Sequence, residues 1–114
     1  MLGFSSHLRY FLCCGEVDMR NGFDGLAGIV RNTLKKDPIS GDVFIFINRR
    51  RTHIKILYWD GDGFALFYKR LERGRYARTT HNDLSKQISR EELMMLLEGL
   101  SFKAVIKKKR FSFS

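Results

Sequence analysis

The chain has 114 residues, which suits one domain around a single modest core. Hydrophobic residues make up 44% of the sequence, which excludes an intrinsically disordered chain, and no apolar run approaches the roughly 20 residues that span a bilayer. The 21 basic and 12 acidic side chains give a net charge of +9, which favours polyanionic partners such as nucleic acid.

The two cysteines, Cys13 and Cys14, are neighbours in the sequence. Adjacent cysteines rarely bond to each other because the geometry is strained, and no second pair is present for a disulfide framework or a zinc site. His7 and Arg9 interrupt the apolar N-terminal stretch, which therefore predicts no signal peptide. Together these features predict a cytoplasmic protein with two reduced thiols.

The first element that the sequence predicts is a strand over residues 8–14. A helix follows, with Asn21 as its N-cap and an apolar stripe through residues 23–34. Lys35 and Lys36 belong to its last turn, where cations interact favourably with the helix dipole. Pro38 ends the helix because a residue before proline is disfavoured in the α region.

Three apolar strands dominate the middle of the chain, over residues 43–47, 54–59 and 64–69. They are rich in β-branched and aromatic residues, which fit a pleated, half-buried surface. The turn between the first two contains Arg49-Arg50-Arg51. The next turn is Asp60-Gly61-Asp62-Gly63, whose residues tolerate positive φ and predict a tight hairpin.

Polar residues and one clear helix signal occupy the region after the meander. We expect residues 75–79 to add a further strand at the sheet edge and residues 80–86 to form a loop. Ser89 and Glu92 have the spacing of a capping box, which predicts that a second helix begins there. Leucines between residues 93 and 100 form its apolar face.

This order of elements predicts an α+β fold, an antiparallel β-meander of about four to six strands packed with two short helices. Residues 102–106 are expected to add a last short strand. A single domain is therefore predicted over residues 1–106. The basic tail over residues 107–114 is expected to be mobile.

Basic side chains gather around the turns of the meander and make up the candidate nucleic-acid site. Its residues are Arg49, Arg50, Arg51, Lys55, Lys69, Arg70, Arg73, Arg75 and Arg78. Arginine suits bidentate contacts with phosphate. In a meander, the first turn and the end of the third strand lie at the same edge of the sheet, so the clusters are expected to form one patch. The alternative is a solvated basic turn that only keeps the protein soluble.

Aromatic residues on the strands have two interpretations. They are Tyr58, Phe64, Phe67, Tyr68 and Tyr76. They can stack on unpaired bases, as in single-strand binders, but aromatic residues at strand spacing more often form a core, and we favour the core. The second and third strands are also apolar on both faces. A face that two short helices leave uncovered would favour a partner protein or self-association.

Carboxylates raise the question of an enzyme. The candidates are Asp18, Asp24, Asp37, Asp60, Asp62 and Glu72. They could supply metal ligands for phosphoryl transfer, so a small metal-dependent nuclease is a third hypothesis. A plain turn explains the Asp-Gly-Asp-Gly segment better, because the later ligands of a calcium loop are missing. We therefore predict no enzyme, no catalytic residues, no metal site and no cofactor.

Several segments in a fixed order resemble a known family. They are Asp18–Leu26, Asp37–Gly41, Arg49–Arg51, Leu57–Gly61, Lys69–Gly74 and Leu96–Leu100. Together they resemble the small accessory proteins, often called TnpB, of the insertion-sequence-66 family of bacterial transposable elements. The resemblance covers roughly residues 8–100. It implies a role in transposition beside a separate, larger transposase that carries the cleavage chemistry, and it assigns no catalytic residue to this chain.

Two segments depart from the pattern of that family. Tyr76-Ala77-Arg78-Thr79 stands where members commonly have an aromatic residue, any residue and Trp-Pro, and Thr52-His53 replaces a more usual Asp-Arg.

The charge, the apolar strands and the family resemblance together lead us to expect one of two functions. One is an accessory protein that binds DNA through the arginine-rich edge. The other is a module that docks on the transposase, or forms a homo-oligomer, without contacting DNA. Neither involves a membrane.

Overall fold

The computed structural model describes residues 4–77 and 82–99 as five strands and two helices. In chain order the elements are β1 Tyr10–Cys13, α1 Phe23–Asn32, β2 Val43–Ile47, β3 His53–Trp59, β4 Phe64–Arg70, β5 Ser85–Ile88 and α2 Arg90–Leu97. The three central strands agree with the predicted ones to within a residue at each end. The α+β class is therefore confirmed.

The five strands form one mixed sheet in the order β4-β3-β2-β1-β5. β2, β3 and β4 make the predicted antiparallel meander. The prediction of a purely antiparallel sheet is wrong, because β1 runs parallel to β2, with Tyr10 opposite Val43 and Leu12 opposite Ile45. The physical reason is α1, which carries the chain back across the sheet, so the next strand starts from the same end as β1.

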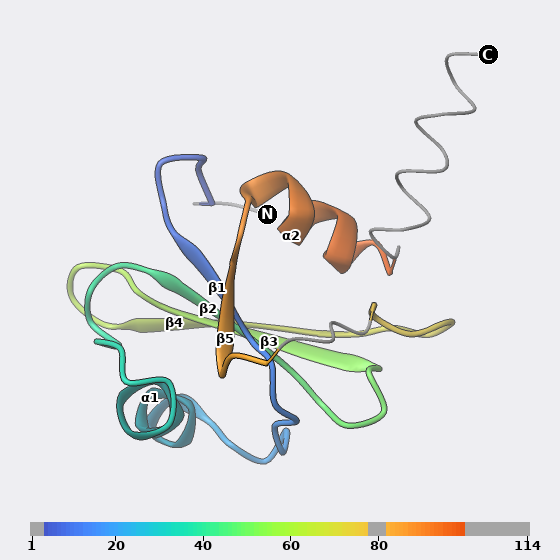
Figure 1. Ribbon diagram of the computed structural model, residues 1–114, viewed down its shortest axis with the longest axis horizontal. Coiled ribbons are helices and arrows are strands. Elements are labelled where there is room, and N and C mark those ends of the chain that lie inside the picture. The colour runs from blue at the N-terminus through green and yellow to red at the C-terminus, as the bar shows by residue number, and fades with distance from the viewer. Residues whose placement is uncertain (1–3, 78–81, 100–114) are drawn as a thin grey trace.

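The two helices lie on opposite faces of the sheet, which gives three layers (Figure 1). α1 packs through Leu26, Ala27 and Val30 in one core cluster. α2 packs through Leu93, Leu96 and Leu97 in the other. β2 is buried along its whole length because it contributes side chains to both clusters alternately. A strand that is buried on both faces has a continuous apolar sequence, which is why β2 could be predicted from the sequence.

The helix termini confirm one predicted cap and correct the other. Ser89 Oγ accepts from the N–H of Glu92, and Glu92 Oε1 accepts from the N–H of Ser89, both at 3.0 Å, so the capping box is confirmed. The cap of α1 is Gly22, and Asn21 does not cap the helix. The amide of Asn21 instead donates to the carbonyl oxygen of Asp18 at 3.0 Å. α1 also ends at Asn32, before the two lysines.

Backbone pairing with β1 makes a strand where the sequence predicted a loop. Ser85 and Lys86 belong to β5, which runs antiparallel to β1 from Cys13 opposite Ser85 to Tyr10 opposite Ile88. The four residues Ser-Lys-Gln-Ile have little intrinsic strand preference, so tertiary pairing decides here. Residues 75–77 are in no strand. Residues 78–79, the predicted strand over 102–106 and the tail over 107–114 lie outside the described residues.

Candidate nucleic-acid interface

The turn between β2 and β3 is held by the side chain of Asn48. Its Oδ1 accepts from the backbone N–H groups of Thr52 at 2.9 Å and His53 at 3.0 Å. The N–H of Arg51 donates to the carbonyl oxygen of Asn48, and Arg51 adopts a left-handed φ of 59°. These bonds fix the backbone on which three consecutive arginines stand. Asn48 was not among the predicted site residues, although an Asn that opens a turn is a known signal for this geometry.

The segment that follows β4 is hydrogen-bonded to the same turn. The N–H of Leu71 donates to Thr52 O at 2.8 Å, and the N–H of Tyr76 donates to Arg51 O at 2.7 Å. Tyr76 is 1% exposed and anchors the segment in the core under α2. The segment between these two anchors carries Arg73 and Arg75. The predicted common edge of the two arginine clusters is therefore present in the structure.

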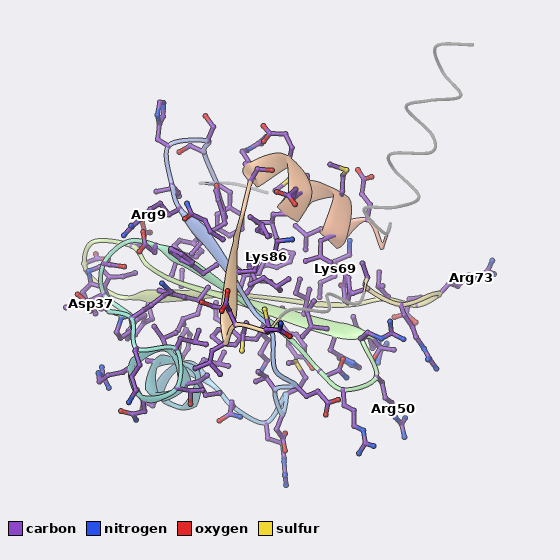
Figure 2. The ribbon with its side chains drawn as sticks, viewed as in Figure 1. Arg9, Asp37, Arg50, Lys69, Arg73 and Lys86 are labelled. Atoms are coloured by element: carbon purple, nitrogen blue, oxygen red, sulfur yellow. The ribbon has the colours of Figure 1, made fainter. Side chains whose placement is uncertain are left out.

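We call the end of the molecule that carries these arginines the basic end. Its members are Arg49, Arg50, Arg51, Arg73 and Arg75. Figure 2 shows Arg50 and Arg73 extending outward at this end, while Arg9 and Asp37 lie at the opposite end. All but the half-buried Arg51 are exposed. Within the described part of the chain none of the five forms an ion pair.

Other predicted site residues have partners inside the protein. Lys55 is 7% exposed, and its Nζ donates to the carbonyl oxygens of Met19 at 2.7 Å and Asn21 at 2.9 Å. Lys69 Nζ donates to Leu97 O at 2.7 Å, at the C-terminal end of α2. Both ammonium groups therefore have hydrogen-bond partners inside the fold.

Arg70 and Arg78 complete the predicted set. Arg70 is exposed and forms an ion pair with Glu72 at 2.9 Å. Both side chains of that pair are well exposed, so it adds little stability and leaves the guanidinium accessible. Arg78 lies outside the described residues.

An open pocket lies against the basic end, where the parallel strands β1 and β2 both finish. Its charged lining consists of Arg49, Arg50 and Arg75 together with Glu16 and Asp18. Asp18 is engaged by Arg20, with Nη2 2.6 Å from Oδ2, and this hydrogen bonding lowers the pKa of Asp18 to about 2. Glu16 was not singled out in the sequence.

A smaller pocket beside it is lined by both cysteines together with Arg49 and Arg51. Both thiols are free, as predicted. Burial raises the pKa of Cys13 and of Cys14. A raised pKa keeps a thiol protonated at neutral pH, so neither cysteine has the character of an activated nucleophile.

The aromatic residues lie mainly in the core, which is the interpretation that we favoured over base stacking. Tyr76 is fully buried, Tyr58 and Phe67 pack against the α2 cluster, and Phe64 packs against the α1 cluster. Tyr68 is the exception, with 53% of its surface exposed. Base stacking by the whole set is therefore incompatible with this fold.

The carboxylates that were considered as metal ligands have local roles. The N–H of Asp60 donates to Gly63 O at 2.8 Å and Gly61 has a φ of 78°, so the Asp-Gly-Asp-Gly segment forms the expected tight turn. Residues 4–77 and 82–99 contain no group of three or more His, Cys, Asp or Glu side chains arranged to hold a metal ion. In the same residues, neither helix has the length and apolar character to cross a membrane.

Comparisons with known proteins agree with the resemblance seen in the sequence. The family model described as "IS66 Orf2 like protein" matches residues 8–107. The uncharacterized protein y4jC of Sinorhizobium fredii (strain NBRC 101917 / NGR234) is 36% identical over 108 residues, covering 95% of this chain and 92% of the relative. Protein y4hO of the same strain, also uncharacterized, is 36% identical over 103 residues and 90% of each chain. No solved structure matches. This chain therefore belongs to the IS66 Orf2-like family and is an accessory protein of IS66 transposition.

Proposed function

We propose that this protein is a non-catalytic, cytoplasmic accessory factor that binds DNA through the basic end. One observation carries the proposal: five arginines from two separate segments are held at one end of the fold by backbone hydrogen bonds between those segments. A solubilising surface does not require such organisation. The ordered backbone lowers the entropy lost when the guanidinium groups bind phosphates.

The chemistry of the basic end suits the phosphate backbone. Each guanidinium presents a planar fork of donors that matches two phosphate oxygens. Neutralising phosphates releases condensed counterions, so affinity falls steeply as salt rises. Phosphate contacts fix position but read no sequence, and the separate transposase remains the candidate for recognising the target.

A matched pair of double variants tests this function. Arg49→Gln with Arg50→Gln removes two charges from the basic end. Arg31→Gln with Lys35→Gln removes two exposed charges elsewhere. We expect the first variant to lose roughly tenfold or more in DNA affinity and to lower the salt slope by about two, and the control to change both much less.

The measurement is fluorescence anisotropy with labelled DNA across a salt series. The probes are a duplex with the terminal repeats of the element, a scrambled duplex and a single strand. Equal losses of DNA affinity in both double variants would contradict a site at the basic end, because they would show that binding depends only on the net charge of the protein. Unchanged affinity in the Arg49 and Arg50 variant would contradict it.

A docking module is the second candidate function, and a specific observation favours it. Tyr68 is 53% exposed on β4, and Trp59, Phe64 and Leu66 are only half-buried on the same face. An apolar strip of this kind suits a protein partner such as the transposase. Co-purification with the transposase, together with no DNA binding at physiological salt, would establish this function in place of the first.

A further inference from the structure

β4 forms one edge of the sheet, and its backbone offers hydrogen bonds on the outer side. It pairs with β3 only, and nothing in residues 4–77 or 82–99 pairs with its other side. Hydrogen bonds from Asp60 N to Gly63 O and from Leu71 N to Thr52 O fix which pairs of the hairpin are hydrogen-bonded. Antiparallel pairs alternate, so the outward N–H and C=O groups belong to Phe64, Leu66, Tyr68 and Arg70.

The two edges of the sheet differ in how they are protected. β5 has four residues, Ser-Lys-Gln-Ile, and its charge and short length discourage pairing with another chain. β4 has seven residues, and its register with β3 continues without a bulge from His53 opposite Arg70 to Trp59 opposite Phe64. Its first five residues, Phe-Ala-Leu-Phe-Tyr, contain neither a charge nor a proline. A long, uncharged edge strand of this kind favours pairing with a strand of another chain.

Apolar side chains lie beside this open edge on the face that α1 covers only in part. Trp59 packs edge-on against Phe64, with ring centroids 5.1 Å apart. Leu66 and Tyr68 continue the strip along β4, and Tyr68 is more than half exposed. A strand that adds to this edge would therefore gain both backbone hydrogen bonds and apolar contacts.

The charges at the two ends of β4 identify the strand that fits. The acidic turn with Asp60 and Asp62 precedes β4, and Lys69 and Arg70 end it. A second copy in the antiparallel direction therefore places the acidic turn of each copy beside Lys69 and Arg70 of the other copy. Centred on Leu66, that pairing sets Phe64 opposite Tyr68 of the other copy and Asp62 opposite Arg70 of the other copy. The outward backbone groups then meet each other in the same register.

We propose that two copies of this chain associate through β4, in antiparallel pairing about a two-fold axis near Leu66, to form one continuous sheet. The interface is isologous, because each copy contributes the same strand. It goes beyond DNA binding by the basic end and does not depend on it.

The test is the molar mass of the full chain in solution, measured by light scattering over a range of concentrations. We expect about twice the chain mass of 13.4 kDa. Tyr68→Glu places a carboxylate opposite Phe64 of the other copy and should raise the dimer dissociation constant roughly tenfold or more. Leu84→Glu, at a site that is 60% exposed and away from β4, is the matched control and should leave the mass unchanged.

A charge exchange tests the register. Asp62→Arg alone and Arg70→Asp alone should each weaken the dimer, and the double variant should restore it. Circular dichroism checks that every variant is folded, and mass is the readout because Arg70 is also a candidate DNA contact. A wild-type protein that stays monomeric at every concentration overturns the proposal. So does a dimer that Tyr68→Glu leaves intact.

Discussion

Lys55 is the residue whose environment departs most from what its type suggests. Its ammonium is buried and forms no ion pair with a carboxylate of residues 4–77 or 82–99. It donates to the carbonyl oxygens of Met19 and Asn21 and lies 4.6 Å from the centre of the Tyr68 ring. Because Nζ bonds the backbone of the loop before α1, this lysine ties that loop to the sheet. Its role is therefore structural.

Replacing Lys55 should destabilise the fold. Lys55→Met keeps most of the aliphatic contact but leaves two carbonyl groups without a donor, which should lower the free energy of unfolding by about 1–3 kcal/mol. Urea denaturation measures this change. Lys86→Met on β5 is the control and should stay within about 0.5 kcal/mol of the wild type. Similar values for both variants would show that the buried hydrogen bonds add nothing.

Tyr76 makes stability depend on alkaline pH. Burial raises the pKa of Tyr76 from 10.0 to about 12. The unfolded chain therefore releases the hydroxyl proton at a lower pH than the folded protein does. The stabilisation that neutral Tyr76 gives the fold is complete below pH 10 and is lost as the pH rises from 10 towards 12. A shift of this size corresponds to about 2–3 kcal/mol. Tyr76→Phe should lose less stability than the wild type over that range in urea titrations. If the stability of Tyr76→Phe and of the wild type fell equally over this pH range, the loss would not come from ionisation of Tyr76.

Glu16 should oppose DNA binding. It lines the pocket with Arg49, Arg50 and Arg75, where a carboxylate repels phosphate. Glu16→Gln should therefore raise DNA affinity severalfold at low salt, and the gain should shrink as salt screens the charges. Fluorescence anisotropy measures both effects. Glu98→Gln, an exposed acidic site at the end of α2, is the control. A larger gain in the control would place the phosphate contacts elsewhere.

The candidate site shows how far single residues could be predicted. The sequence identified the basic cluster because charge and turn signals are local. It could not separate Lys55 and Lys69 from the arginines, because strand register decides which side chains face inward. Lys55 lies opposite Phe46 and Tyr68 in the sheet, on the face that α1 and its preceding loop cover.

At the scale of elements, two glycines of α1 should respond differently to replacement by alanine. A Cβ at Gly28 would meet only Asn32 Nδ2 at 4.0 Å, whereas a Cβ at Gly25 would lie 2.3 Å from Asn21 Oδ1. Gly28→Ala should stabilise the protein by about 0.5–1 kcal/mol through helix propensity. Gly25→Ala should gain less or destabilise, because Asn21 must move and give up its bond to Asp18 O. Thermal unfolding compares the two variants directly. Equal stabilisation would show that Asn21 moves freely.

The elements also show why some signals succeeded and others failed. The strands of the meander were predictable because apolar β-branched and aromatic residues fill them. β5 was not, because its polar sequence becomes a strand only beside β1. The parallel direction of β1 was missed for a related reason: direction is a property of how α1 returns the chain, and no residue in β1 encodes it.

At the scale of the whole molecule, the net charge of +9 acts against compactness. The melting temperature should therefore rise as NaCl increases from about 0.05 to 0.5 M, because salt screens repulsion within the basic end. The variant Arg49→Gln with Arg50→Gln should show a smaller rise. Differential scanning calorimetry without DNA measures both slopes. A melting temperature that does not change with salt would show that the arginines are too solvated to repel one another.

Pairing through β4 would also decide how the basic ends are arranged. Antiparallel strands point their equivalent ends in opposite directions, and the basic end lies at one end of β4. A dimer of the proposed kind therefore carries its two arginine clusters at opposite ends of one sheet. Such a particle can contact two separate DNA segments at once.

The position of β1 between β2 and β5 has a consequence for synthesis on the ribosome. β2, β3 and β4 are consecutive and can pair as soon as Arg70 has left the exit tunnel. β1 gains its second neighbour only when β5, which begins at Ser85, has also emerged, and α2 follows directly after it. In the nascent chain, Tyr10 and Leu12 therefore lack their packing partners on β5 and α2 until both of these elements have left the tunnel. Mutations that slow the emergence of β5 should affect yield more than the stability of the finished protein.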